Sequence, residues 1–525
     1  MRLGLGFALA LAAFAAPVEA ADGPVVAVET GKLQGVAATP GSPVQIFRGV
    51  PYAKPPVGDL RWREPRPAQD WQGVRAADQF GPRCMQRHMW DDMFFRSPKA
   101  DEDCLYLNVW TPANLSKAAS AKLPVLVYIY GGGFIAGTSD EPRYDGAAMA
   151  ARGIVVVTVN YRLGIFGFFS HPQLTGESAH KASGNYGLLD QAAALAWVKR
   201  NITAFGGDPK HITVGGESAG SISVSGMMVS PLTRNLIVGA IGESGSALPP
   251  LHLLTLADAE KKGMDFAESL QVPTLSQLRA IPADKLLSVQ DFQGARWWPD
   301  IDGYYFAEAP EETYAAGKAA KAASLIGSNS QESGAGAILG DAPLTVANYQ
   351  AGLQKRYGAD ADRMFQLYPA ASDADVQRAA TELASDAFIA AGTWNWFDHQ
   401  RKAGWPTYYY HYTHVRPQPT AFKATGPAAY GALHSAEIEY ALGNLDANPA
   451  YAWTEADRKV SATMSAYWAN FIKTGNPNGG DLPLWPQAPA DAGQIQRQVI
   501  DVDTRRVAFP EQARYQAALP ILMRH

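Results

Sequence analysis

Four short apolar runs rich in β-branched residues constrain the fold of this chain more than any other feature. They are residues 123–130 (LPVLVYIY), 153–161 (GIVVVTVNY), 211–216 (HITVGG) and 322–327 (AASLIG). Such runs are typical of strands buried on both faces. Between the second and third runs, residues 184–208 repeat apolar side chains at helical spacing and end on a pair of glycines. Strand, helix and strand in this order predict a right-handed parallel crossover, with helices on both faces of the sheet.

The second half of the chain favours helices. From about Leu248 onward, helical patterns dominate, as in residues 257–270 and 372–397. We therefore expect an α/β fold in which a large, mostly parallel central sheet is flanked by helices, with helical cap insertions over one end. There is no repeat period and no long Ser/Gly linker, so residues 21–525 are predicted to form a single domain.

The first twenty residues resemble a secretory signal. Arg2 precedes an apolar run, and Val18-Glu19-Ala20 is a cleavage-like site. The run is too short to span a membrane, and no later stretch reaches 18 uninterrupted apolar residues. The sequence predicts removal of residues 1–20 and a secreted or periplasmic protein without an integral membrane segment. The alternative is a cytosolic protein with an apolar start.

Charge and cysteine content exclude other classes of protein. The net charge is −5, and no cluster of lysine and arginine indicates nucleic-acid binding. The chain has two cysteines, Cys84 and Cys104, and neither lies beside histidines spaced as zinc ligands. In an exported protein this pair is predicted to form a structural disulfide.

The triplet Gly-Glu-Ser occurs three times and offers three candidate nucleophiles, Ser178, Ser218 and Ser244. Only Ser218 follows a β-branched run and precedes an apolar helical segment, the strand–turn–helix setting of a nucleophile elbow. Glycines at 216 and 220 would let strand and helix pass closely there, and the helix N-terminus would direct backbone N–H groups at the attack site. The other two copies have histidine or serine where the second glycine is required. The sequence therefore predicts Ser218 as the nucleophile.

A serine hydroxyl needs a base, and the base needs an orienting carboxylate. When an elbow serine is used, the acid and then the histidine follow it in the chain, which leaves five candidate bases: His399, His411, His414, His434 and His525. His434 stands in a small-residue loop just before a helical segment, whereas His411 and His414 lie in an aromatic, strand-like run and His525 ends the chain. Glu332 comes just after the predicted strand 322–327, where α/β sheets carry ligand-handling groups. A solvated loop carboxylate is the other interpretation of Glu332.

The oxyanion of an acyl-transfer reaction needs backbone donors. Three glycines, 131–133, directly follow the predicted strand 123–130, with Tyr130 in the position that often holds histidine. We expect donors from Gly132, Gly133 and Ala219, the residue after the nucleophile.

At this point the sequence resembles the type-B carboxylesterase and cholinesterase family of α/β-hydrolases over nearly the whole mature chain. Beyond the elbow, the resemblance rests on five segments: FRGVPYAKPPVGDLRW (47–62), EDCLYLNVW (102–110), NYRLGIFGF (160–168), GNYGLLDQ (184–191) and FGGDP (205–209). It implies a triad of Ser218, Glu332 and His434. It also implies that Cys84 and Cys104 form the family's first disulfide, at the rim of the active-site gorge.

Further roles are implied by the same resemblance. Ser244 falls where the family has a serine that supports the acid, and Glu217, beside the nucleophile, is expected to support the site. Four aromatic residues are candidates for the substrate pocket: Trp90, Phe134, Trp297 and Trp298. Packing in the core is the other interpretation of Phe134, Trp297 and Trp298. Trp90 lies in the first disulfide loop, but the loop is shorter than in cholinesterases and its register differs, so choline recognition is not expected. No further disulfide is possible, as expected of a bacterial secreted member.

The sequence predicts a serine carboxylesterase that hydrolyses small-molecule esters through an acyl-enzyme, without metal or organic cofactor. Two alternatives stay open. One is an amidase or peptidase, because a triad does not by itself distinguish ester from amide. The other is a catalytically inactive binding or adhesion member of the same fold, although here all three triad positions hold competent side chains. The natural substrate and the oligomeric state cannot be deduced from the sequence.

Overall fold

The computed structural model of the chain describes residues 23–39, 41–112, 115–272, 274–292, 296–421, 429–491 and 493–525. The predicted signal segment 1–20 lies outside the described residues. Among the described residues, no helix combines the length and the apolar character needed to cross a membrane.

An 11-stranded sheet forms the centre of the molecule, in the order β18-β17-β16-β15-β12-β11-β9-β10-β8-β4-β3. From β10 to β17 all neighbours pair in parallel, and the strands at both edges pair antiparallel. The prediction of a large, mostly parallel sheet is confirmed. The strands are β3 (Val36–Ala37), β4 (Gln45–Pro51), β8 (Tyr106–Thr111), β9 (Leu123–Ile129), β10 (Val155–Val159), β11 (Gly207–Glu217), β12 (Gly239–Glu243), β15 (Ala323–Asn329), β16 (Thr407–Tyr412), β17 (Gln496–Ile500) and β18 (Arg505–Ala508).

Among the residues that the structure describes, seven short strands lie outside the central sheet. They form a three-stranded sheet and two pairs: β1 (Val25–Val28), β2 (Gly31–Gln34) and β5 (Val74–Ala76); β6 (Arg83–Cys84) with β7 (Ala100–Asp101); and β13 (Leu254–Thr255) with β14 (Asp300–Ile301).

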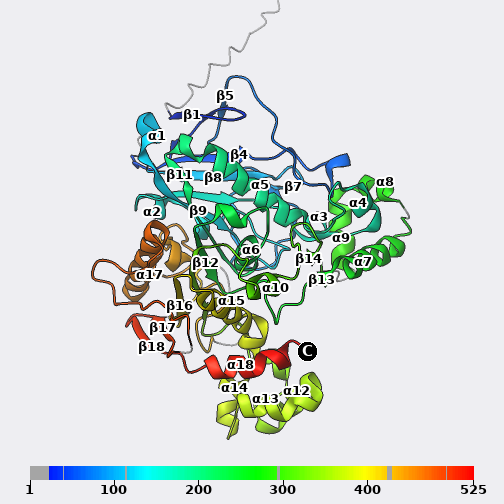
Figure 1. Cartoon of the computed structure of the whole chain (residues 1–525), viewed down its shortest axis with the longest axis vertical. Helices are drawn as coiled ribbons and strands as arrows, with labels where there is room; N and C mark the ends of the chain where they lie inside the picture. The colour runs from blue at the N-terminus through cyan, green and yellow to red at the C-terminus, as the bar shows by residue number, and fades with distance from the viewer. Residues whose placement is uncertain are drawn as a thin grey trace, which may run out of the picture.

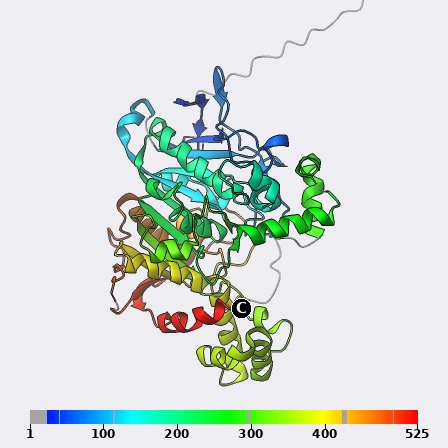
Figure 2. The same cartoon turned by 45° about the vertical axis from the view of Figure 1, so that its right-hand side comes forward.

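Helices surround the sheet in both views of the molecule (Figure 1 and Figure 2). The helices of the first half are α1 (Ala118–Ala121), α2 (Ala147–Ala150), α3 (Gly164–Phe168), α4 (Pro172–Glu177), α5 (Tyr186–Asn201), α6 (Ala219–Met227), α7 (Leu256–Ser269), α8 (Leu275–Ala280) and α9 (Ala283–Phe292). Those of the second half are α10 (Pro310–Ala315), α11 (Gly336–Leu339), α12 (Val346–Tyr357), α13 (Ala361–Leu367), α14 (Asp373–Ser385), α15 (Ala391–Lys402), α16 (Ile438–Leu442), α17 (Glu455–Thr474) and α18 (Gln512–Leu522). In both views α12, α13 and α14 group at the lower end of the molecule, beside α18.

The four predicted strands are present as β9, β10, β11 and β15, and the predicted crossover helix is α5. Strand β11 is longer than the apolar run that predicted it, because its pairing with β9 begins at Gly207 and shifts register before Ile212. Strand β12 was not predicted. Its sequence, GAIGE, contains two glycines, which weaken a strand signal.

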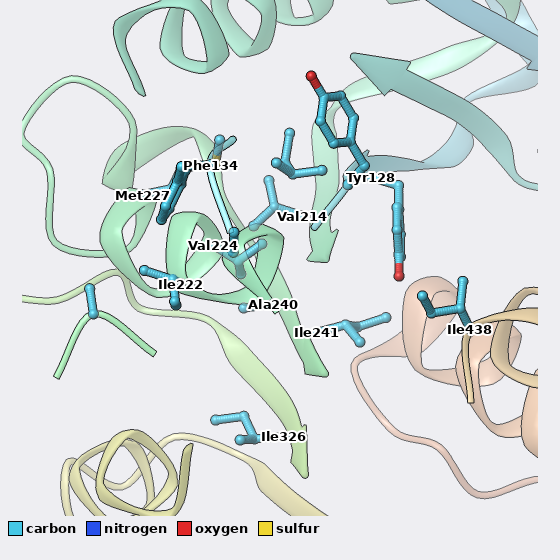
Figure 3. Packing of buried hydrophobic residues seen from close by; sticks show 14 of the residues in the cluster. Tyr128, Phe134, Val214, Ile222, Val224, Met227, Ala240, Ile241, Ile326 and Ile438 are labelled. Carbon is cyan, nitrogen blue, oxygen red and sulfur yellow. The ribbon is translucent and has the colours of Figure 1, made fainter. Parts of the chain in front are cut away.

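Helix α6 fixes the position of the site by packing on the centre of the sheet. Figure 3 shows Val224 of α6 beside Val214 of β11 and Ala240 of β12. All three side chains are fully buried. Burying an aliphatic side chain of this size contributes about 1.5–3 kcal/mol, so this contact anchors the helix that begins at the predicted nucleophile.

Candidate active site

Ser218 occupies the turn between β11 and α6. Its backbone has φ 57° and ψ −123°, a conformation that L-residues rarely adopt, and it directly precedes the first residue of the helix. A serine at a strained strand-to-helix turn presents its Oγ at the carboxyl end of the sheet. The predicted strand–turn–helix setting is confirmed.

The glycines that flank Ser218 allow this turn to form. A Cβ on Gly216 would lie 2.6 Å from the carbonyl oxygen of Ile129 and 2.7 Å from the carbonyl carbon of Gly220. A Cβ on Gly220 would overlap the same Ile129 oxygen. Since these neighbours are backbone atoms that cannot rotate away, both positions require glycine, as the sequence predicted.

Gly216→Ala is expected to destabilise the protein by about 3 kcal/mol, the upper end of the usual cost of overpacking a core. Gly176→Ala is the matched control, because it alters the first glycine of another Gly-Glu-Ser triplet, where a Cβ would meet no atom within 4 Å. Thermal unfolding of both variants measures the difference. An unchanged Tm for Gly216→Ala would contradict the close approach of strand and helix.

His434 connects Ser218 to Glu332. Its Nε2 lies 2.9 Å from Ser218 Oγ, and its Nδ1 lies 2.6 Å from Glu332 Oε2. The Glu332 side chain is fully buried, while that of His434 is 24% exposed. Glu332 follows β15 and His434 precedes α16, and the two loops meet in a bridge between Gln331 and Leu433. The three side chains that the sequence proposed from distant segments are therefore in hydrogen-bond contact.

Two hydrogen-bond donors contact the second carboxylate oxygen of Glu332. Ser244 Oγ donates to Glu332 Oε1 over 2.6 Å, and the backbone N–H of Asn329 donates to the same oxygen over 2.5 Å. The Oγ of Ser385, at the end of α14, accepts from the backbone N–H groups of Glu332 and Ser333. Ser244 therefore contacts the carboxylate, as the resemblance implied. Asn329 and Ser385 were not predicted, and no motif in the sequence marks them.

Glu217 is the second carboxylate close to the histidine. Its Oε1 lies 3.3 Å from His434 Nε2, and the side chain is buried. Burial lowers the pKa of His434, but the charges of Glu217 and Glu332 outweigh this effect and raise it above the ordinary value of 6.5. Burial raises the pKa of Glu217 itself, against the opposing effects of His434 and Arg143. The charge of each group therefore shifts the pKa of the other.

The glycine loop lies against the predicted nucleophile. A Cβ on Gly131 would be 3.0 Å from the Cβ of Ser218. Gly132 and Gly133 have φ 99° and 61°, both left-handed, which glycine adopts without strain. Gly132, Gly133 and Ala219 line the same cavity as Ser218. The backbone groups predicted to bind an oxyanion are thus brought together with the serine.

Tyr130 fills the position before these glycines. Its ring stacks on that of Tyr161, with centroids 4.5 Å apart, and Tyr161 OH donates to the Tyr130 carbonyl over 2.9 Å. Both rings are buried. This stacked pair holds in place the residue from which the glycine loop starts.

The cavity that opens onto the three side chains has a volume of about 1070 Å³. Trp90 and Trp298 line it, but Phe134 and Trp297 do not. Phe134 is fully buried and packs edge-to-face against Trp298. Trp297 packs in the core against Phe169 and Phe266. The pocket assignment of Phe134 and Trp297 is corrected accordingly, because packing with other aromatic rings takes up both side chains.

Loops, rather than long helices, form most of the cavity wall. Within the described part of the chain, six helices of the predicted insertions do not line it: α7, α8, α9, α12, α13 and α14. A π-helical turn, Asp386–Ala390, joins α14 to α15 and brings Phe388 and Ile389 to the cavity. π-helical turns of this kind are frequent at functional sites.

The disulfide shapes the opposite wall. Cys84 and Cys104 are bonded, as predicted, and the loop between them carries residues 89–93 to the cavity. Asp92 of this loop faces Arg143 and Arg416, with nitrogen–oxygen distances of 3.5 and 3.7 Å. The cross-link and these charges together hold the loop beside the site.

The rejected candidates lie elsewhere. Ser178 follows α4 and donates to Glu64, away from the cavity. His414 Nε2 contacts Asp457 at 2.8 Å, and His525 contacts Asp360. His411 lies within β16, as its aromatic surroundings predicted.

Comparison with known proteins finds similarity to carboxylesterases over nearly the whole chain. The model of the carboxylesterase family matches residues 22–517. The chain is 36% identical to the fumonisin B1 esterase of Sphingopyxis macrogoltabida over 492 residues, covering 91% of this chain and 87% of that protein. It is also 36% identical to carboxylesterase 5A of Canis lupus familiaris, covering 89% and 84% of the two chains. Liver carboxylesterase 1 of Oryctolagus cuniculus is 36% identical, with 86% and 85% covered.

Proposed function

Because the chain belongs to the carboxylesterase family and is a carboxylic ester hydrolase, we propose that it works through a Ser218–His434–Glu332 triad and an acyl-enzyme. The observation that carries the proposal is the pair of contacts made by His434, one from each ring nitrogen. A histidine placed between a serine hydroxyl and a buried carboxylate can act as base and then as acid.

In the acylation step, His434 Nε2 takes the proton of Ser218 Oγ as that oxygen bonds to the ester carbonyl carbon. Glu332 accepts a hydrogen bond from Nδ1–H, which keeps Nε2 free for the proton and stabilises the imidazolium. When the tetrahedral intermediate collapses, His434 protonates the alcohol oxygen, and the alcohol leaves. Water then attacks the acyl-enzyme with His434 again as base, which releases the carboxylic acid and restores Ser218.

The negative charge of both tetrahedral intermediates develops on the former carbonyl oxygen. Backbone N–H groups of Gly132, Gly133 and Ala219 would stabilise it, and Ala219 adds the positive end of the α6 dipole. The loss of one such donor typically costs about 3–4 kcal/mol of transition-state stabilisation. Backbone donors that are fixed before the substrate arrives need no reorganisation during the reaction.

Turnover of matched ester and amide substrates tests the reaction type. We expect hydrolysis of p-nitrophenyl esters in a series from acetate to palmitate, and much slower hydrolysis of the corresponding anilides. Faster cleavage of the anilides would favour the amidase alternative. A folded protein that cleaves neither series would favour the inactive binding member.

The pH dependence of the reaction tests the role of Glu217. Neutral His434 is the base, so kcat/KM should rise with pH through the His434 pKa, with a midpoint above 6.5. The negative charge of Glu217 favours the imidazolium, so Glu217→Gln should move this midpoint to lower pH. A pH profile of both proteins measures the shift. An unchanged midpoint would show that Glu217 does not act on His434 through its charge.

We also propose that the protein is exported and that residues 1–20 are removed. The disulfide supports this proposal, because such bonds persist in oxidising compartments. Expression of the full chain in a bacterium should therefore give a periplasmic or secreted protein whose N-terminal sequence starts at Ala21. An intact N-terminus on protein recovered from the cytoplasm would contradict export.

A further inference from the structure

Exposed apolar side chains gather at the mouth of the active-site cavity. In the described part of the chain, fifteen large apolar side chains are exposed, and five of them line this one cavity: Met89, Trp90, Phe388, Val415 and Leu433. We call these five residues the apolar rim. Scattered exposed apolar residues are normal, but a contiguous group at a ligand site marks a binding surface.

The apolar rim is continuous with apolar residues deeper in the cavity. Leu248, Leu251, Trp298 and Ile389 line the same space and are buried or half-buried. The volume of about 1070 Å³ slightly exceeds the range of roughly 300–1,000 Å³ that is typical of pockets for drug-sized ligands. A short ester would leave much of this space unfilled.

Among the rim residues, Phe388 contacts the proposed catalytic base with its ring. It is 54% exposed, and its ring meets that of His434 edge-to-face, with centroids 5.3 Å apart. The π-helical turn that carries it is anchored by neighbours, since Asp386 accepts a hydrogen bond from Tyr368 and faces Arg514 at 3.0 Å. A fixed, exposed aromatic ring beside the base is suited to pack against an apolar part of the substrate.

We propose that the substrates are esters with an extended apolar arm that bind as single molecules. The arm is long enough to pass from Ser218 through the cavity and lie on the apolar rim. This inference rests on the proposed esterase function and specifies its substrate class. Covering the rim removes exposed apolar area from water, which stabilises the bound long substrate relative to a short one. Phe388 and Val415 stand at different segments of the rim and serve as separate tests.

The experiment compares long and short substrates in two series. In one, the acyl chain of p-nitrophenyl esters grows from acetate to octanoate, and in the other, the alcohol of alkyl acetates grows from ethyl to octyl, all below the concentrations at which they aggregate. Wild type is compared with Phe388→Ala, Val415→Ser and the control Leu484→Ser. Leu484 is 60% exposed and does not line the cavity.

We expect kcat/KM of wild type to rise with length in at least one series. In that series, Phe388→Ala and Val415→Ser should each lower the long-to-short ratio by roughly 4–15-fold, the effect of one to two buried methylenes, while Leu484→Ser leaves it unchanged. A flat length profile with normal turnover of acetate would overturn this inference and leave the esterase proposal intact. Absence of all ester turnover would overturn both.

Two further outcomes would also overturn the inference. If Phe388→Ala slows short and long esters equally and moves the pH profile, Phe388 only positions His434. If rates increase only when the substrate aggregates, the rim docks on a lipid–water interface instead of binding a single molecule.

Discussion

Replacement of Ser218 by alanine is expected to lower kcat for ester hydrolysis by about 10⁴–10⁶-fold, because removal of the nucleophile of a serine triad leaves only oxyanion stabilisation and binding. The hydroxyl removed is the one that lies 2.9 Å from His434 Nε2. The measurement is the hydrolysis of p-nitrophenyl acetate by purified wild type and variant, with circular dichroism to show that both are folded.

Ser178→Ala is the matched control, since it removes the same hydroxyl from the same triplet at a site away from the cavity. We expect it to keep wild-type activity. If Ser218→Ala folds and retains activity, the choice among the three Gly-Glu-Ser triplets is wrong.

The second large effect is expected for Glu332→Gln, which should lower kcat by about 10⁴-fold, as amide substitutions at the acid of such triads do. The glutamine keeps the shape of the side chain, but it removes the charge that stabilises the imidazolium and can present N–H to Nδ1, which favours the wrong tautomer of His434. The same change removes a charge that raises the His434 pKa.

Glu437→Gln provides the control for an isosteric change at a buried carboxyl group. Burial and the charges of Glu217 and Glu243 raise the pKa of Glu437 well above its ordinary range, and glutamine keeps the shape of this side chain. Its activity should stay within a few-fold of wild type. Comparable losses in both variants would indicate general disruption instead of a specific role of Glu332.

Much of the site could be predicted because its chemistry depends on local patterns. Strand and helix pass closely at Ser218, which requires glycine at 216 and 220. This requirement can be recognised in five consecutive residues of the sequence. Chain order and local patterns made Glu332 and His434 candidates, since Glu332 follows a buried run and His434 stands in a small-residue loop before a helical segment. The resemblance to a known family then brought the three residues together.

Other parts could not be predicted because they depend on contacts between distant segments. Ser385 supports the loop of Glu332 from 53 residues away, and a serine at the end of a helix carries no sign of that role. Trp297 and Trp298 are adjacent and chemically identical, yet one lies in the core and the other lines the cavity. The direction of each ring depends on its packing partners, and these partners cannot be identified from the amino-acid composition.

The spacing of the proposed catalytic groups along the chain has a consequence for biogenesis. Ser218 and His434 are 216 residues apart, and the strands that carry Ser218, Glu332 and the approach to His434 pair in parallel across the middle of the sheet. Parallel pairing over such separations closes late in folding. A nascent or truncated polypeptide would therefore contain Ser218 but would not hydrolyse esters. Recovery of ester hydrolysis during refolding would report the completion of the whole sheet, which makes catalysis a sensitive assay of foldedness for this chain.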